Sequence, residues 1–450
     1  GTGASYDGLV ELFDNADYLA DNGQTHAVGG SLLTGTGALI APAESTFEFT
    51  ATTTGRTIDL NEAIMFDATF SGSGDWTLSD PTFTASNDVA ITGGDLTLPI
   101  GTTTIGGSFD NTAGAFDANG GLLYFTSGDA GNTVEFGGSD ANTVLFSGIG
   151  TWSFADTNAT STDSFTVATG TVTLPSGTLT VEEDFIIIDT IAHNSGTLQM
   201  VGTTGGNLVT LNGNDLSNLT VIATGGDYTL TDSSAALLGS LTLADGTFTV
   251  GTGTVSIGGS FDVSGGIYNN GSGILLFNST DGGEFIDPGS NDLSNVIIAG
   301  AGGWSLIGNA TTTNNFAITN AGTLMVSPGV RVYVGNVFTN NVGGAATTWT
   351  DTILVLDGAN EYETNVKVTT TEVYGTLELG ENTDISMWNS SAATNTVPLT
   401  SSLYSQDNAG VDGDLYIYGD YHVGTTTEYW SAETDFDGNF TIDKVKTGDT

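Results

Sequence analysis

The amino-acid sequence predicts an all-β protein, a parallel β-helix or β-solenoid, from three observations. The chain repeats itself at a fixed interval, apolar and polar residues alternate inside each repeat, and 65 of the 450 residues are glycine. Self-similarity at a fixed period is typical of stacked architectures, in which each unit packs only on its neighbours. Alternation with a period of two indicates short strands with one buried face, and glycine suits the tight turns between them.

The repeat is clearest at an aromatic position that follows a glycine-rich segment, as in Phe70-Ser-Gly-Ser-Gly-Asp-Trp76. The same position recurs with constant spacing at Trp76, Trp152, Tyr228 and Trp304. A glycine column keeps the same spacing at Gly94, Gly170, Gly246 and Gly322. Columns that hold their register across four units indicate one continuous repeat architecture.

Each repeat contains about nine strand-like segments, so we expect three coils of about 25 residues, each with three strands. Adjacent coils lie about 4.8 Å apart, which makes one repeat about 14 Å long. An array of small β-sandwich domains is the alternative. The units join without linkers or changes of composition, which favours the solenoid.

The register also predicts which side chains face the interior. We expect one aligned interior row, formed by Leu96, Val172, Phe248 and Leu324. By the period of two, a second set faces the same way, formed by Leu98, Leu174, Val250 and Val326.

Three regions are expected along the chain. Residues 1–17 form an N-terminal strand or assembly segment, and residues 18–350 form the solenoid body, with units that start near 18, 94, 170, 246 and 322. Residues 351–450 lose the repeat and gain Tyr, Trp and Glu, which predicts a divergent β-rich cap or assembly module.

The charge of the chain is strongly acidic. Asp and Glu number 52 against 5 Lys and Arg, giving a net charge of −47. Such a surface repels nucleic acid and anionic lipid, so neither is expected as a partner. The acids form either an ordinary solvated surface or an adaptation to salt or calcium. No cysteine is present, which excludes disulfides and thiolate chemistry.

Membrane insertion is not expected, because the longest apolar run, around Phe185-Ile-Ile-Ile188, is too short to span a bilayer. The chain begins at Gly1 without a visible signal peptide, as expected of a processed secreted protein.

Segments of the type Gly-Thr-hydrophobic-Thr-hydrophobic and turns such as Ile105-Gly-Gly-Ser-Phe109 recur over residues 18–350. In this respect the chain resembles the repetitive β-helical surface proteins of prokaryotes, namely haemagglutinin-like and autotransporter-like adhesins and solenoid surface or filament proteins. The resemblance implies a secreted, extracellular or cell-surface location and a structural or adhesive role. It transfers no catalytic residue.

Catalytic groups are scarce, which predicts that the protein is not an enzyme. The three histidines, His26, His193 and His422, do not recur with the repeat. A polysaccharide-degrading β-helix, the least favoured alternative, relies on a basic residue near a bound cation. Here the only arginines are Arg56 and Arg331, which are several units apart.

Two columns of the repeat are candidate functional positions. The aromatic column Trp76, Trp152, Tyr228 and Trp304 forms either a row of sugar-stacking platforms for surface glycans or plugs that fill the core. A column of aspartates, Asp80, Asp156 and Asp232, is expected to cap turns through its carboxylates.

One candidate metal site lies near the C-terminus. Glu433, Asp435, Asp437 and Asn439 occupy every second position, as ligands do at the start of an EF-hand-like calcium loop. Lys444 stands where such a loop places its bidentate acid, so an ordinary acidic turn is the alternative. No cofactor is required, and calcium is the one candidate.

The ends of the chain carry strand-capable segments outside the repeat, and we expect them to join copies of the protein head to tail. The residues of this assembly site are Leu9, Val10, Leu12, Phe13, Phe440, Ile442, Lys444 and Lys446. Uncovered strand edges are templates for another chain. The expected function is an extracellular structural protein that forms a filament or surface layer. The alternatives are an adhesin or glycan-binding stalk, and tails that fold back to cap their own subunit.

Overall fold

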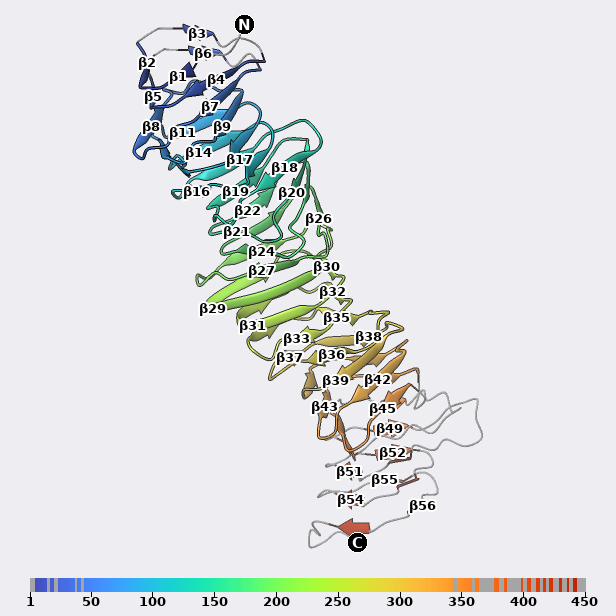
Figure 1. Ribbon diagram of the computed structural model, residues 1–450. Coiled ribbons are helices and arrows are strands. Elements are labelled where there is room, and N and C mark those ends of the chain that lie inside the picture. Colours follow the sequence, from blue (N-terminus) through green and yellow to red (C-terminus); the bar gives the residue numbers. More distant parts are fainter. Residues whose placement is uncertain are drawn as a thin grey trace. The chain divides into compact units, whose positions relative to one another are not determined.

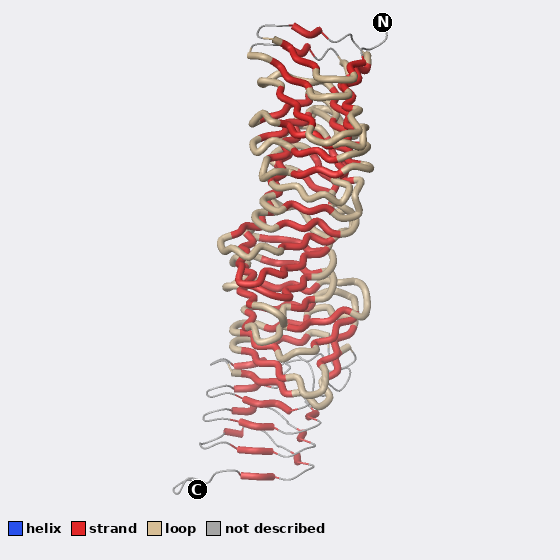
Figure 2. The backbone as a smooth tube through the Cα atoms, turned by 60° about the vertical axis from the view of Figure 1, so that its left-hand side comes forward, coloured by secondary structure: helices blue, strands red, loops and turns tan. Residues whose placement is uncertain are grey.

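The computed structural model describes residues 5–13, 17–19, 23–36, 39–41, 44–342 and 346–357, and beyond residue 357 only the backbone of the strands β47 to β57 (Figure 1). For residues 17–19 and 39–41 it likewise describes the backbone alone. The described residues form strands and turns and no helix (Figure 2). Their strands pair in parallel with strands of the preceding and following coils, which confirms the predicted β-solenoid. The chain divides into two compact units, residues 1–217 and 218–450, which are described in turn.

The first unit has three main ladders of parallel strands. One is a ten-stranded sheet of β1 (Ser5–Tyr6), β4 (Thr25–Val28), β7 (Thr46–Phe49), β9 (Asp67–Phe70), β12 (Val89–Ile91), β15 (Phe109–Asn111), β18 (Asn132–Glu135), β20 (Thr151–Phe154), β23 (Thr171–Thr173) and β26 (Thr190–Ala192). The second is a six-stranded sheet of β2 (Val10–Leu12), β5 (Leu32–Thr34), β8 (Arg56–Asp59), β10 (Asp75–Leu78), β13 (Asp95–Thr97) and β16 (Ala115–Asp117).

The third, here called the neutral ladder, consists of β11 (Thr82–Ala85), β14 (Thr102–Ile105), β17 (Leu122–Phe125), β19 (Thr143–Phe146), β22 (Phe165–Val167), β25 (Phe185–Ile187) and β28 (Asn207–Thr210). Shorter pairings complete the unit, namely β3 (Asp17–Leu19) with β6 (Leu39–Ala41), and β21 (Ala159–Ser161) with β24 (Thr178–Val181) and β27 (Thr197–Met200).

The second unit is built in the same way. One ladder contains β29 (Asn218–Leu230), β31 (Leu241–Thr249), β33 (Phe261–Asp262), β36 (Glu284–Asp287), β39 (Gly303–Leu306), β42 (Thr323–Val326) and β45 (Thr347–Thr348), with β34 (Ile267–Asn269) also paired to β31. A six-stranded sheet contains β30 (Ser234–Leu237), β32 (Thr254–Ile257), β35 (Ile274–Phe277), β38 (Asn295–Ile298), β41 (Phe316–Ile318) and β44 (Phe338–Asn340).

Parallel pairing continues beyond residue 350. An eight-stranded sheet contains β37 (Asp292–Leu293), β40 (Ala310–Thr312), β43 (Arg331–Val334), β46 (Ile353–Leu356), β48 (Thr376–Leu379), β51 (Leu403–Ser405), β54 (Tyr421–Val423) and β57 (Phe440–Ile442). Two smaller sheets contain β47 (Glu361–Glu363), β49 (Asp384–Ser386), β52 (Gly410–Asp412) and β55 (Tyr429–Trp430), and β50 (Pro398–Leu399), β53 (Tyr416–Ile417) and β56 (Asp435–Phe436).

The coil is shorter than expected. Many residues paired between adjacent coils are 20 or 21 positions apart, as in Thr82 with Thr102 and Leu122 with Thr143, and a few coils are longer, as in Phe109 with Val134. The predicted coil of about 25 residues is therefore wrong, because it assumed a whole number of coils in each repeat. Strands of three or four residues joined by short corners need only about 20 residues, so one repeat spans about three and two-thirds coils.

This mismatch places equivalent residues of successive repeats on different faces. Trp76 lies in β10 of the six-stranded sheet, whereas Trp152 lies in β20 of the ten-stranded sheet. The expected single row through Leu96 and Val172 is therefore wrong. Both residues are in the interior, at 1% and 0% exposure, but each pairs with the aromatic residue of the preceding coil, Leu96 with Trp76 and Val172 with Trp152.

The same vertical pairing recurs in the second unit, where Tyr228 pairs with Phe248 and Trp304 pairs with Leu324. In each repeat, the residue of the aromatic column therefore pairs with the apolar residue that lies one coil further along the chain. All eight residues of the two predicted interior sets are buried.

Stacked side chains and turn amides hold the coils together. Phe49 and Phe70, one coil apart, stack with ring centroids 4.9 Å apart, and Phe125 and Phe146 stack at 4.5 Å. At the corners, asparagines with positive φ donate their side-chain amide to the coil below, as from Asn119 to the Leu98 carbonyl at 3.1 Å. Asparagine tolerates this left-handed backbone and replaces a missing hydrogen bond at the turn.

Candidate functional site

The strand β2 lies at the outer edge of the six-stranded sheet. Val10 donates its N–H to the Ser31 carbonyl at 2.8 Å, and the Leu12 carbonyl accepts from Gly35 at 2.6 Å. Successive residues of a parallel strand direct their backbone groups to opposite neighbours, so the N–H and C=O of Glu11 face away from β5. Within the part of the chain that the structure describes, no strand pairs with this side of β2.

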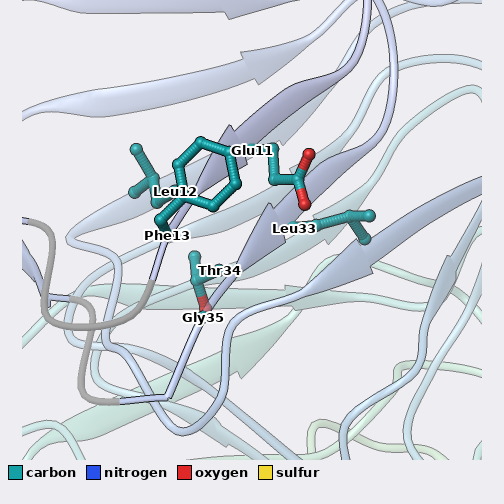
Figure 3. A pocket seen from close by; sticks show the side chains of 6 residues that line it. All are labelled: Glu11, Leu12, Phe13, Leu33, Thr34 and Gly35. Carbon is teal, nitrogen blue, oxygen red and sulfur yellow. The ribbon is translucent and has the colours of Figure 1, made fainter.

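Apolar side chains accompany this edge. Leu9 is 60% exposed and Phe13 is 72% exposed, on either side of β2. A pocket of about 330 Å³ opens beside them, lined by Glu11, Leu12, Phe13, Leu33, Thr34 and Gly35 (Figure 3). The Thr34 hydroxyl in this pocket is buried and has no hydrogen-bond partner among the described residues. An edge with free backbone groups and exposed apolar side chains is suited to receiving another strand.

The C-terminal half of the predicted assembly site is only partly described. Phe440 and Ile442 lie in β57, the outermost strand of the eight-stranded sheet. Lys444 and Lys446 lie outside the described residues.

The candidate calcium loop also falls largely outside what is described. Of Glu433, Asp435, Asp437 and Asn439, only Asp435 has a described backbone, in β56, and none has a described side chain.

The aromatic column belongs to the core. Trp76 and Trp152 are 1% exposed, Tyr228 is 0% exposed and Trp304 is 2% exposed. The Trp152 indole donates to the Gly107 carbonyl at 3.4 Å, and the Trp76 ring packs edge-on against Phe70 at 5.6 Å. A sugar cannot stack on rings that solvent does not reach, so of the two interpretations the structure supports core packing and not the glycan platform.

The aspartate column caps turns, as expected, although the turns belong to the preceding coil. Asp80 accepts hydrogen bonds from the backbone N–H groups of Leu60 and Asn61. Asp156 accepts from Phe136 and from Gly137, the latter at 3.1 Å. Each carboxylate therefore joins two coils, which is a structural task for an acidic residue.

Carboxylates line the outer face of the ten-stranded sheet. Asp110 stands directly opposite Glu135 in the ladder, and the Asp88 N–H donates to Asp67 at 3.1 Å. Burial, together with Asp67 and Asp110, raises the pKa of Asp88, although a hydrogen bond from Ser108 opposes the shift. Burial, together with Asp156 and Asp110, raises the pKa of Glu135. Like charges on adjacent strands repel, so this face is costly to keep ionised.

Catalytic groups are not gathered in the described part of the chain. It holds no group of three or more His, Cys, Asp or Glu placed to bind a metal ion. His193 accepts a hydrogen bond from the Ser195 N–H at 3.0 Å, and Arg56 donates to the Thr53 hydroxyl at 2.6 Å. His26 is buried. These contacts hold local turns and core positions.

A groove in the second unit was not predicted. It encloses about 500 Å³ and is lined by Asp227, Asp245, Ile267, and glycines that include Gly225 and Gly265. A hydrogen bond from Thr224, with another from the Gly246 N–H, lowers the pKa of Asp245. The sequence signal is the two Gly-Gly pairs, Gly225-Gly226 and Gly265-Gly266, which in the sequence look like ordinary turns.

No family model, curated protein or solved structure matches the chain. In the described residues, no helix has the length and apolar character needed to cross a membrane.

Proposed function

We propose that this is an extracellular structural protein whose copies join head to tail through their terminal strands. The observation that carries the proposal is the edge of β2, with the outward backbone groups of Glu11 and the exposed side chains of Leu9 and Phe13. Joining β2 of one copy to β57 of the next would continue the parallel ladder from one chain into another. Main-chain hydrogen bonds give such a joint affinity without a large apolar patch.

The charged residues near the two ends of the chain also support head-to-tail joining. Asp7 and Glu11 flank the N-terminal edge, and Lys444 and Lys446 follow β57 in a chain with only five cations. A lysine of one end that faces an acid of the other favours a heterologous contact over the pairing of like ends. A heterologous contact that does not close into a ring propagates as an open polymer.

A structural role also agrees with the way the repeat uses its recurring residues. The aromatic, glycine and aspartate columns serve packing, close approach and turn capping. We therefore propose no catalytic activity and no required cofactor. The burial of the aromatic column removes the proposed stacking platform for glycans and with it the main support for an adhesin.

The experiment compares single substitutions at the edge with a matched substitution elsewhere. Phe13→Asp and Glu11→Pro should abolish end-to-end assemblies in negative-stain images, because one adds a charge at the joint and the other removes the outward N–H donor. Ile149→Asp is the control, since Ile149 is 82% exposed at a corner of the same unit. It should assemble like the parent.

Two results would count against the proposal. If the parent and the edge variants assemble alike, the N-terminal edge is not the joint. If deletion of residues 1–14 increases association, the segment behaves as a tail that caps its own subunit.

A further inference from the structure

The neutral ladder of the first unit has no charged residue in any of its seven strands. The neighbouring faces are different. Strands of the ten-stranded sheet carry Glu48, Asp67, Asp110 and Glu135, and those of the six-stranded sheet carry Glu11, Arg56, Asp59, Asp75, Asp95 and Asp117. In a chain with 52 acidic residues, a seven-stranded ladder without a charge is notable, although the short ladder of β21, β24 and β27 is also uncharged.

Strands that carry acids in one repeat have counterparts in the neutral ladder that carry none, although Asp75 and Asp95 are likewise replaced, by Thr151 and Thr171, on the ten-stranded sheet. Strands β7, β9 and β15 of the ten-stranded sheet become β17, β19 and β25 of the neutral ladder one repeat later, because the repeat does not fill a whole number of coils. At the equivalent positions of the neutral ladder, uncharged residues stand in place of the acids of those three strands. The replacements are Glu48 by Tyr124, Asp67 by Thr143, and Asp110 by Ile186.

The outward side chains of the neutral ladder form a continuous row in register. It runs through Thr84, Thr104, Tyr124, Leu145, Thr166, Ile186 and Thr210. All are half-buried by their neighbours in the row. Its central positions are Tyr124, Leu145, Thr166 and Ile186, which are uncharged and include three large side chains. Asp163 and Asp184, which lie at the corner just before β22 and β25, give it a polar rim, as in protein interfaces.

The second unit has a face of the same kind. The six strands β30, β32, β35, β38, β41 and β44 contain no charged residue. Their outward row runs in register through Ala236, Ser256, Leu276, Ile297, Ala317 and Thr339. Its centre is apolar.

We propose that the neutral ladder is a lateral docking surface for a second copy of this chain. Two copies that met through the acid-bearing strands of the ten-stranded or six-stranded sheet would bring carboxylates together, and like charges in contact exclude wrong partners strongly. The neutral ladder avoids this repulsion. A second copy also has the same spacing between strands, about 4.8 Å, so the two rows interdigitate as in sheet-on-sheet packing.

The size of the face sets the strength of the contact. Seven strands of about four residues cover roughly 34 by 13 Å, or about 440 Å² per copy. A stable complex buries about 800 Å² per partner. One such face therefore gives a weak and reversible contact.

The test adds one negative charge at the centre of the row. Leu145→Asp and Ile186→Asp both replace outward side chains, so the core is left intact. Thr173→Asp is the matched control, because Thr173 faces outward on β23 of the ten-stranded sheet. All three are made with Phe13→Asp, which removes the end-to-end contact and leaves only lateral association to measure.

Sedimentation velocity over a range of concentrations, in 0.15 M and 0.5 M salt, gives the readout. The Phe13→Asp parent should associate with increasing concentration, and more at high salt, where the remaining carboxylates are screened. Leu145→Asp and Ile186→Asp should weaken this association roughly tenfold or more, and Thr173→Asp should not. Circular dichroism checks that each variant is folded.

Three results would overturn the proposal. The first is a parent that remains monomeric at every concentration and salt. The second is association of the two row variants that equals that of the control. The third is a neutral polysaccharide that binds the monomeric parent and loses affinity for Leu145→Asp, which would make a glycan the occupant. None of these results bears on the joint at β2, whose failure would appear only when Phe13 is intact.

Discussion

The glycine column gives a sharp test of how the coils approach one another. Gly94 has φ +71° and lies above the aromatic residue of the preceding coil. A Cβ added there would overlap the Gly74 carbonyl oxygen and lie 2.7 Å from the Gly72 oxygen and 3.0 Å from Cζ3 of Trp76. The change Gly94→Ala therefore combines a left-handed backbone with a collision.

Two contributions make up the expected loss of stability. A residue with a Cβ in the left-handed region costs about 1–2 kcal/mol. Overpacking in a filled interior costs about 1–3 kcal/mol more. Gly94→Ala should therefore lower the free energy of unfolding by about 2–5 kcal/mol.

Gly120→Ala separates the two contributions. Gly120 has the same φ of +71°, but nothing lies within 4 Å of an added Cβ. This variant should lose only the backbone part, about 1–2 kcal/mol. Gly170→Ala should behave like Gly94→Ala, because its Cβ would lie 2.9 Å from Cζ3 of Trp152.

Urea unfolding followed by circular dichroism provides the measurement, with the midpoint and slope compared among the three variants. The decisive quantity is the difference between Gly94→Ala and Gly120→Ala. If the two midpoints shift equally, the glycine column is required only for its backbone angle, and the close approach of ring and coil does not determine it.

Three further predictions concern the core, pH and metal ions. Phe248→Asp places a charge at a position that is 1% exposed and should cost about 4 kcal/mol or more, whereas Thr249→Asp, on the outer side of the same strand, should unfold near the parent in urea. Raised pKa values of Asp88 and Glu135 mean that the folded chain binds protons more tightly than the unfolded chain, so the urea midpoint should rise as pH falls from 7 to about 4. Asp88→Asn should flatten that rise, and a midpoint that falls over this range contradicts the argument. Chelation should leave the β signal of circular dichroism unchanged, since no metal-binding group is found among the described residues, and a large loss would show that the acids hold ions.

Local patterns in the sequence were sufficient for the fold class and for the interior. A period of two defines which side of a strand is buried, so Leu96 and Leu98 could be placed in the core from alternation alone. The column of aspartates predicted turn capping by Asp80, but not that its partners, Leu60 and Asn61, lie one coil earlier. The placement of core residues depends only on neighbours in sequence.

The coil length and the identity of each face depend on residues that are far apart in sequence. Nothing within one repeat shows how many residues complete a coil, and a whole number of coils in each repeat is the simplest prediction from the sequence alone. The true spacing is given by the paired partners of Trp76, which are Arg56 on the coil before and Leu96 on the coil after. The uncharged faces could not be predicted from the sequence for the same reason, because they are recognised only when strands from successive coils are aligned.

The mismatch between repeat and coil has a physical consequence for the surface. If the repeat filled a whole number of coils, equivalent residues of all repeats would lie on the same face. A difference in charge between two faces would then follow from the repetition alone. Because one repeat spans about three and two-thirds coils, equivalent segments of successive repeats lie on different faces. An acid of the ten-stranded sheet, if it recurred in the next repeat, would therefore lie on the neutral ladder. The substitutions of Glu48 by Tyr124 and of Asp110 by Ile186 therefore oppose what repetition alone would produce. The neutral ladder keeps all seven of its strands free of charge, as the proposed lateral interface requires.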